Sequence, residues 1–134
     1  MKKLFVDTNI FLRFILKDNL RQAEKVKDLF KAAEGKKVVL KTNVLVIAEF
    51  AWTLKSFYKF SKKKICNRIK KILQLDFIQI DEKDSVLEAI NIFEKKNVDF
   101  IDCLNFVFAK DRQLKIASFD RDFDKLDKRL RYKF

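Results

Sequence analysis

Four acidic side chains stand in apolar surroundings where a globular chain rarely places a charge. They are Asp7 after LFV, Glu49 within VLVIAEFAW, Asp102 within FIDCLNFVF and Asp120 after KIASF. Carboxylates are seldom buried without a partner, because loss of water disfavours the ionised form. Four such positions along one chain predict a shared acidic pocket, and a pocket of that kind usually needs a divalent cation.

The chemistry of such a pocket follows from its charge. Carboxylates packed together repel one another, so some take up protons or a cation binds between them. Oxygen ligands without histidine or cysteine favour Mg²⁺ or Mn²⁺ over zinc. A metal held this way can lower the pKa of bound water and stabilise the charge that develops during phosphodiester displacement. Nuclease chemistry is therefore the economical interpretation.

Glu49 carries the sharpest local signal, because it is the only polar residue between Val44 and Trp52. A salt bridge to a distant lysine is the alternative explanation. Asp102 lies in a helical pattern, and Asp99, three residues earlier, shares its face. Asp99 can cap that helix, whereas Asp102 lies too far inside it to do so.

Asp7 and Asp120 each have a simpler interpretation when taken alone. Asp7 can be the N-cap of the helix that follows, and Asp120 can be a turn residue. Asp122 and Asp124 follow in FDRDFD, so each of the three is a candidate for the fourth acid. The joint placement is the stronger signal, because one pocket at the ends of strands can gather all four acids.

The complete absence of histidine restricts the mechanism further. It removes imidazole as a base, an acid or a metal ligand, and with it the metal-free ribonuclease chemistry that uses a histidine pair. Catalysis must then rely on carboxylates, lysines, hydroxyls or a metal.

The chain is strongly basic, with 31 Lys and Arg against 19 Asp and Glu and a net charge of +12. This excess favours a polyanionic partner, with nucleic acid first and a membrane surface second. Six of the ten residues from 62 to 71 are basic, and apolar residues at helical spacing turn these cations outward. The candidate nucleic-acid contacts are Lys62, Lys63, Lys64 and Arg68, although an ordinary solvated face explains the run equally well. The tail 128–133 is a second basic candidate.

Buried strands are expected at 3–6, 38–40, 77–80 and 115–119, with a terminal edge strand at 132–134. Apolar residues at helical spacing predict helices near 10–16, 23–33, 44–57, 61–73, 86–93, 99–111 and 123–126. This alternation predicts an α/β domain with a mostly parallel sheet covered on both faces. Ligands of such sheets bind beyond the carboxyl ends of the strands, where Asp7 and Asp120 fall.

A single domain over residues 1–134 is expected, because one Gly and no Pro leave little linker sequence. Cys66 and Cys103 lack a CxxC pattern and are expected to be small buried hydrophobes of a reduced, cytoplasmic protein. The apolar stretch at the N-terminus is too short for a signal peptide, and no stretch is long enough to span a bilayer.

Four segments, VDTNIFLRFIL, VIAEFAW, VDFIDCLNFVFA and IASFDRDFDKL, follow one another along the chain. In their order and intervals they resemble the PIN-domain ribonucleases, and in particular the VapC-type toxins of bacterial and archaeal toxin–antitoxin pairs. The resemblance spans essentially the whole chain. It implies a Rossmann-like, three-layer α/β/α fold with a mostly parallel central sheet.

Position by position, the resemblance implies that Asp7, Glu49, Asp102 and Asp120 are the catalytic, metal-binding acids. Asn9 matches the polar position of the opening motif, and Ser118 matches the hydroxyl position before the fourth acid. Together with Asp99, these two residues are expected to lie next to the metal-binding acids and to orient them without binding the metal directly.

The resemblance also implies Mg²⁺ or Mn²⁺, cleavage of single-stranded or structured RNA, a homodimer, and inhibition by a small antitoxin. The expected function is a metal-dependent endoribonuclease, the toxin of a type II pair. One alternative is a PIN nuclease that processes RNA without an antitoxin. The other is a catalytically silent nucleic-acid-binding module, against which the intact set of four acids argues.

Overall fold

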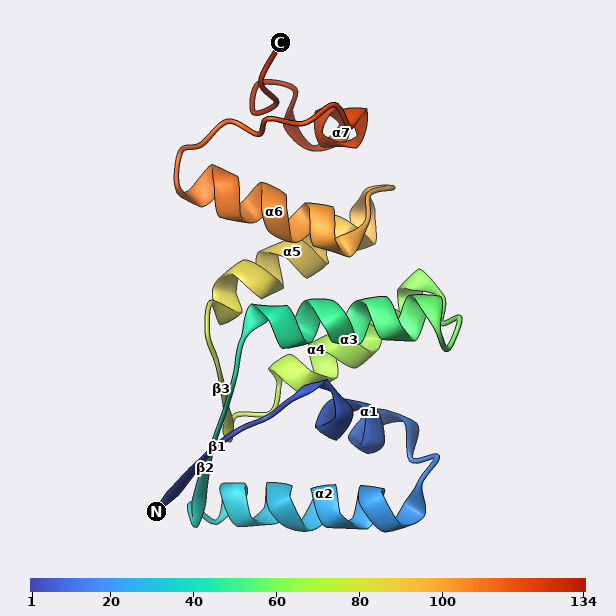
Figure 1. Ribbon diagram of the computed structural model, residues 1–134, viewed down its shortest axis with the longest axis vertical. Coiled ribbons are helices and arrows are strands. Elements are labelled where there is room, and N and C mark those ends of the chain that lie inside the picture. Colours follow the sequence, from blue (N-terminus) through green and yellow to red (C-terminus); the bar gives the residue numbers. More distant parts are fainter. The chain divides into compact units, whose positions relative to one another are not determined.

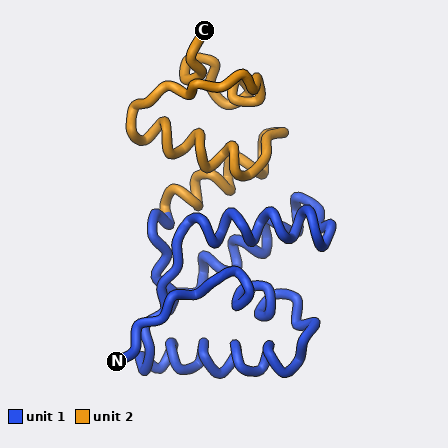
Figure 2. Tube along the Cα trace, in the orientation of Figure 1, with its two compact units in different colours: residues 1–83 blue, residues 84–134 orange.

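The computed structural model describes residues 1–134, which form two compact units (Figures 1 and 2). Unit 1 comprises residues 1–83 and unit 2 comprises residues 84–134. Each unit is described separately below. No helix in either unit is both long and apolar enough to cross a membrane.

Unit 1 is built on a three-stranded parallel sheet in the order β1-β2-β3. The strands are β1 (Lys2–Phe5), β2 (Val38–Thr42) and β3 (Ile78–Ile80). In the sheet, Leu4 lies opposite Leu40, and Leu40 lies opposite Ile78. Side chains alternate between the two faces of a strand, so this register gathers the apolar residues of β2 and β3 on one face.

Four helices connect the strands: α1 (Thr8–Leu16), α2 (Leu20–Glu34), α3 (Val44–Ser56) and α4 (Lys62–Leu73). Parallel strands are joined by right-handed crossovers, and two successive crossovers in one direction place their helices on the same face. Figure 1 shows all four helices on one side of the strands. Leu40, Ile78 and Ile80 are buried, whereas Lys41 and Gln79 between them are exposed.

The structure corrects one expectation for unit 1. Residues 3–6 were expected to be a buried strand, but every residue of β1 is exposed and only Val6, just beyond it, is buried. Val6 is held by two hydrogen bonds. Its N–H donates to the carbonyl of Lys41 at 2.8 Å, and the buried hydroxyl of Thr42 donates to its carbonyl at 2.8 Å.

Unit 2 contains α5 (Lys83–Lys95), which begins at the boundary, α6 (Phe100–Asp111), the 3-10 turn η1 (Arg121–Phe123) and α7 (Asp124–Asp127). The rings of Phe93 on α5 and Phe100 on α6 meet edge to face, with 5.7 Å between their centroids. Edge-to-face aromatic pairs add to the stability gained from burial alone. This contact therefore joins the two helices of the unit.

The predicted strand at 115–119 is wrong as a strand. Only one parallel bridge forms, between Ile116 and Arg131. The Ile116 N–H donates to Leu130 at 2.7 Å, and the Tyr132 N–H donates to the Ile116 carbonyl at 2.8 Å. A strand needs successive ladder hydrogen bonds, and here they are confined to one residue. The predicted edge strand at 132–134 is reduced to the same bridge.

Within unit 1 the four helices cover one face of the sheet, whereas helices on both faces were expected (Figure 1). Several other expectations agree with the structure. Helices occupy each predicted helical segment, and Asn43 and Ser61 accept hydrogen bonds from Val46 and Lys64 as N-caps. Cys66 in unit 1 and Cys103 in unit 2 are both fully buried. The α/β class with a parallel sheet is confirmed.

Candidate metal and nuclease site

Asp7 lies two residues after the end of β1, at the carboxyl end of the sheet in unit 1. It is the N-cap of α1, and its Oδ1 accepts a hydrogen bond from the Asn9 N–H at 3.0 Å. The capping interpretation of Asp7 is therefore correct in the structure. Both residues are exposed, so the second carboxylate oxygen of Asp7 remains open to a ligand.

Glu49 lies in the middle of α3, on its exposed side. The expectation that its apolar neighbours bury it is wrong, because α3 buries only one face, which carries Ile47, Phe50 and Leu54. The other face exposes Trp52, three residues after Glu49, with 58% of its surface accessible. Glu49 therefore needs no buried partner to be stable.

The helices that carry Asp7 and Glu49 pack against each other. Phe11, one turn after Asp7, meets Phe50, the neighbour of Glu49, edge to face at 6.2 Å between ring centroids. Both rings are fully buried. This contact fixes α1 relative to α3 and, with them, the backbone from which the two acids project.

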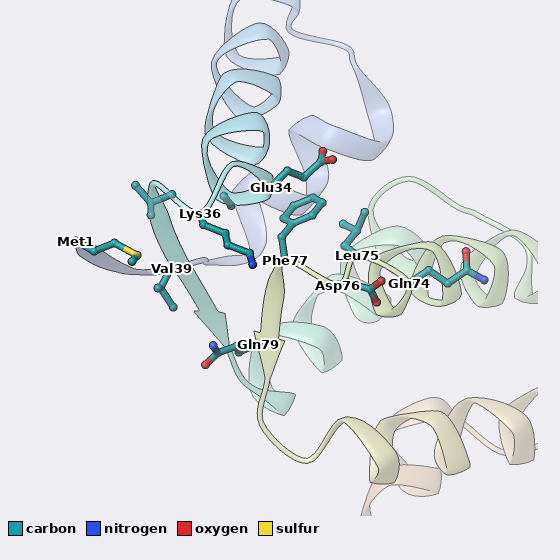
Figure 3. Close-up of a pocket in the computed structure, with 11 residues that line it drawn as sticks. Met1, Glu34, Lys36, Val39, Gln74, Leu75, Asp76, Phe77 and Gln79 are labelled. Atoms are coloured by element: carbon teal, nitrogen blue, oxygen red, sulfur yellow. The ribbon is translucent and has the colours of Figure 1, made fainter.

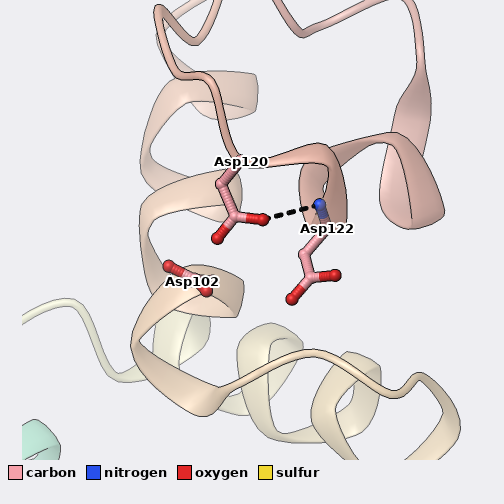
Figure 4. Close-up of side chains that lie close together, drawn as sticks. All are labelled: Asp102, Asp120 and Asp122. Carbon is pink, nitrogen blue, oxygen red and sulfur yellow. Dashed lines mark hydrogen bonds between the residues drawn. The ribbon is translucent and has the colours of Figure 1, made fainter.

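Three carboxylates come together in unit 2 (Figure 4). Asp102 projects from the first turn of α6, Asp120 is the N-cap of η1, and Asp122 lies within η1. Oxygen atoms from these three side chains all lie within 4.8 Å of one another. The structure therefore brings together two of the four predicted acids, Asp102 and Asp120, and adds Asp122.

Backbone hydrogen bonds orient the loop that carries Asp120. The Ser118 hydroxyl accepts from the Asp120 N–H at 3.0 Å, and Asp120 Oδ1 accepts from the Asp122 N–H at 2.8 Å. Figure 4 shows the latter bond as a dashed line and the other oxygen of Asp120 facing Asp102. Ser118 thus shapes the turn that presents the carboxylate.

Burial and nearby negative charges together shift the pKa of Asp102. Partial burial raises the pKa of this carboxyl above its ordinary value, and the negative charges of Asp120, Asp99 and Asp122 raise it further. Asp99 occupies the N-cap position of α6, but its side chain makes no capping hydrogen bond there. Its effect on Asp102 is that of a nearby like charge.

The structure separates the three candidates for the fourth acid. Asp124 forms a two-bonded ion pair with Arg131, with N–O distances of 2.8 and 3.1 Å. The hydrogen bond from Arg131 is the main reason that the pKa of Asp124 is lowered. Asp122 also pairs with a cation, Lys125, at 2.9 Å, but its carboxylate and that of Asp120 lie close to Asp102. The sequence carried no signal for this difference, because it depends on an arginine seven residues further along.

The carboxylate trio fits a divalent cation of the Mg²⁺ or Mn²⁺ kind. Its donors are all carboxylate oxygens, which hard cations prefer. Burial is the main cause of the raised pKa of Asp102, and the neighbouring negative charges, which a cation would offset, add to it. Asp7 and Glu49 belong to unit 1, and their participation in the same site stays a prediction.

An open cavity of about 700 Å³ lies elsewhere, in unit 1 (Figure 3). It is lined at the amino ends of the strands, by Val38 of β2 and by Phe77 just before β3, together with Lys36 and Asp76. None of the four predicted acids lines it. Ligands of parallel sheets bind at the opposite, carboxyl ends, so this cavity is not a candidate catalytic site.

The basic helix α4 has the predicted orientation. Its buried face carries Ile65 and Ile69, and Lys63 and Lys64 are exposed in its first turn. Arg68 is partly exposed one turn later. Cations at a helix N-terminus oppose the positive end of the helix dipole, so this placement is not explained by helix stability.

The comparisons with known proteins cover residues of both units. The model of one protein family, the PIN domain, matches residues 4–129 and so includes nearly all of unit 1 and unit 2. The chain belongs to the PIN-domain family. It is also 30% identical over 122 residues to a VapC ribonuclease of Aquifex aeolicus (strain VF5), with 90% of each chain covered. No solved structure gives a significant match.

Membership in this family confirms the predicted PIN-like fold class and the resemblance on which it was based. It does not assign roles to individual residues. Of the three acids in the trio, Asp122 was predicted only as an alternative to Asp120. The basis for that alternative was the run of aspartates in FDRDFD.

Proposed function

We propose that this chain is a metal-dependent endoribonuclease and the toxin of a type II toxin–antitoxin pair of the VapC kind. The observation that carries the proposal is the match to a VapC ribonuclease over 90% of both chains. The carboxylate trio in unit 2 supports it, because hydrolysis of phosphodiesters without histidine calls for a metal held by acids.

In this proposal, Asp7, Glu49 and Asp102 hold the principal ion, Mg²⁺ or Mn²⁺. Asp120 completes the site or helps to hold a second ion, with Asp122 beside it. When bound, the metal supplies a nucleophile activated at neutral pH and stabilises negative charge on the phosphate. The chain's own part is to present oxygens in fixed orientations, which the backbone bonds at Asp120 illustrate.

The supporting residues have distinct proposed tasks. Asn9 gives its backbone N–H to Asp7, which leaves one oxygen of that acid available. Ser118 holds the turn before Asp120. Asp99 adds negative charge beside Asp102 and so strengthens the demand for a cation.

RNA is the proposed substrate, and α4 is one proposed contact surface. Lys62, Lys63, Lys64 and Arg68 form a basic patch on a chain of net charge +12. Each lysine that meets a phosphate releases counterions, which makes binding dependent on salt.

We further propose that residues 1–134 act as one PIN-like domain, because a single family model spans both units. The proposed setting is a cytoplasmic homodimer that a small antitoxin protein inhibits. An RNA-processing nuclease without an antitoxin is the competing function. Co-expression with the product of a neighbouring small gene separates the two, because only a toxin is silenced by it.

A cleavage assay tests the catalytic proposal. The purified chain should cut single-stranded RNA with Mg²⁺ or Mn²⁺ and should stop in excess EDTA. Asp7→Asn and Asp102→Asn should each lower the cleavage rate by about a hundredfold or more, because each removes a charged metal ligand. Asp28→Asn, an exposed change on α2, is the matched control and should leave the rate unchanged. Undiminished cleavage in EDTA contradicts the proposal.

A further inference from the structure

Unit 2 contains a second polar feature, separate from the acid trio. It is an open cavity of about 700 Å³ formed entirely by residues between 115 and 133. Six cationic side chains line it: Lys115, Arg121, Lys128, Arg129, Arg131 and Lys133. One carboxylate, Asp124, is also in the lining. Two of the six cations pair with acids, Arg131 with Asp124 and Arg129 with Asp127, so the cavity keeps an excess of positive charge.

The cavity is held together by specific contacts. Arg131 donates two hydrogen bonds to Asp124, and its third donor reaches the carbonyl of Ser118 at 3.5 Å. The side chains of Arg131 and Asp124 are only 17% and 20% exposed. Lys115 donates to the carbonyl of Arg129 at 3.0 Å. These bonds join the segment just before Asp120 to the C-terminal segment, so the cationic lining is organised before any ligand binds.

Residues that line the cavity are close in sequence to two acids of the trio, Asp120 and Asp122. Arg121 lines the cavity and stands between Asp120 and Asp122 in the sequence. Ser118 accepts from Asp120 through its hydroxyl and from Arg131 through its carbonyl. This arrangement suits a polyanion such as a nucleic-acid strand. One of its phosphates would lie at the carboxylates with their cation, and the neighbouring phosphates would lie at the basic side chains.

We propose that this C-terminal basic cavity binds backbone phosphates of the RNA strand that flank the phosphate to be cut. The inference rests on the proposed ribonuclease function and deepens it by naming a second contact surface. Contacts to phosphates fix position without reading bases. The cavity therefore holds single-stranded RNA and single-stranded DNA of equal length with similar strength.

The magnitude follows from counterion release. Each phosphate contact on a single strand contributes about 0.7 to the slope of log affinity against log salt. Each contact therefore makes the affinity roughly fivefold higher at about 0.1 M salt than at about 1 M salt. Loss of two contacts should therefore weaken binding by about 25-fold and reduce the slope by about 1.4.

The experiment measures binding of a fluorescent single-stranded RNA to full-length protein that carries Asp102→Asn, in excess EDTA, so that cleavage is suppressed. In this background, Lys128→Gln with Lys133→Gln should show the loss of about 25-fold in affinity and the smaller salt slope. Lys128→Arg with Lys133→Arg should keep the affinity, which separates lost charge from lost folding. Lys25→Gln with Lys27→Gln, exposed on α2, is the matched control for net charge and should bind normally.

The outcomes are distinct from those of the catalytic proposal. Equal affinity of the Gln pair and its control, for RNA and for single-stranded DNA, overturns the cavity as a phosphate site. If an acidic peptide binds there and RNA binding does not change, the cavity serves a protein partner and the proposal is wrong. A chain that binds RNA through the cavity but never cleaves it disproves the ribonuclease function and leaves the phosphate site standing.

Discussion

Replacement of Asp102 by Asn should have opposite effects on stability with and without metal. Asp102 lies within 4.8 Å of both Asp120 and Asp122, measured between carboxylate oxygens. The substitution removes two of the three repulsive pairs and changes little of the side-chain volume.

The repulsion can be estimated from the distance. Two unit charges about 4.8 Å apart repel by about 0.9 kcal/mol in water. Screening by about 0.1 M salt lowers this to about 0.5 kcal/mol, which is the appropriate figure for partly exposed groups. In a chelator, Asp102→Asn should therefore stabilise the protein by about 1 kcal/mol.

Bound metal should reverse the order of stability of the native protein and the Asp102→Asn variant. A ligand at a hundred times its Kd stabilises the native state by about 2.7 kcal/mol. The native protein should gain this amount with Mg²⁺, whereas Asp102→Asn, which lacks one ligand, should gain much less. The native protein should then be the more stable of the two.

Urea denaturation followed by circular dichroism measures both arms, first in EDTA and then over a Mg²⁺ titration. Asp28→Asn on α2 removes one negative charge outside the acid trio. Its gain in stability with Mg²⁺ should equal that of the native protein. The reasoning is refuted if Asp102→Asn is less stable than the native protein in EDTA, or if its response to Mg²⁺ is equal.

Three further predictions concern other contacts. Because Arg131 lowers the pKa of Asp124, that carboxylate stabilises the fold above its unfolded pKa of about 3.9, and the contribution disappears as the pH falls below it. Asp124→Asn should therefore destabilise the protein near pH 6 but not near pH 2, as measured by urea midpoints across this range. Lys63→Glu with Lys64→Glu should stabilise α4 by about 0.3–1 kcal/mol per residue through the helix dipole, yet weaken RNA binding in an anisotropy titration. Thr42→Val should cost about 1–3 kcal/mol in urea denaturation, because the buried Val6 carbonyl loses its hydroxyl donor.

Each of these has a clear contrary result. A pH-independent effect of Asp124→Asn contradicts the ion-pair argument. RNA affinity that is unchanged by the two glutamates makes the first turn of α4 an ordinary solvated surface. An unchanged midpoint for Thr42→Val shows that the hydroxyl is not needed to hold the end of β1.

Local chemistry was enough to predict most of the elements. Asp7, Asn43 and Ser61 are caps because their short polar side chains can accept from the N–H groups two or three residues ahead. The apolar spacing of α4 correctly placed Ile65 and Ile69 inside. These relations involve neighbours in sequence, and the sequence displays them directly.

Tertiary choices were harder to predict. Glu49 looked buried because Leu45 and Trp52 are apolar, yet α3 leaves both exposed. The selection of Asp122 over Asp124 depended on which carboxylate Arg131 engages. Neither choice follows from spacing, because both depend on which surfaces of an element meet another part of the fold.

Each of the two units contains a single cysteine, Cys66 on α4 in unit 1 and Cys103 on α6 in unit 2, and both are fully buried. A buried thiol reacts with a labelling reagent only when its surroundings open. Variants that retain one cysteine, Cys66→Ala or Cys103→Ala, therefore report the opening of one unit at a time. Equal labelling rates across a urea series mean that both units open in one cooperative event, as a single domain requires, whereas unequal rates give each unit an opening free energy of its own.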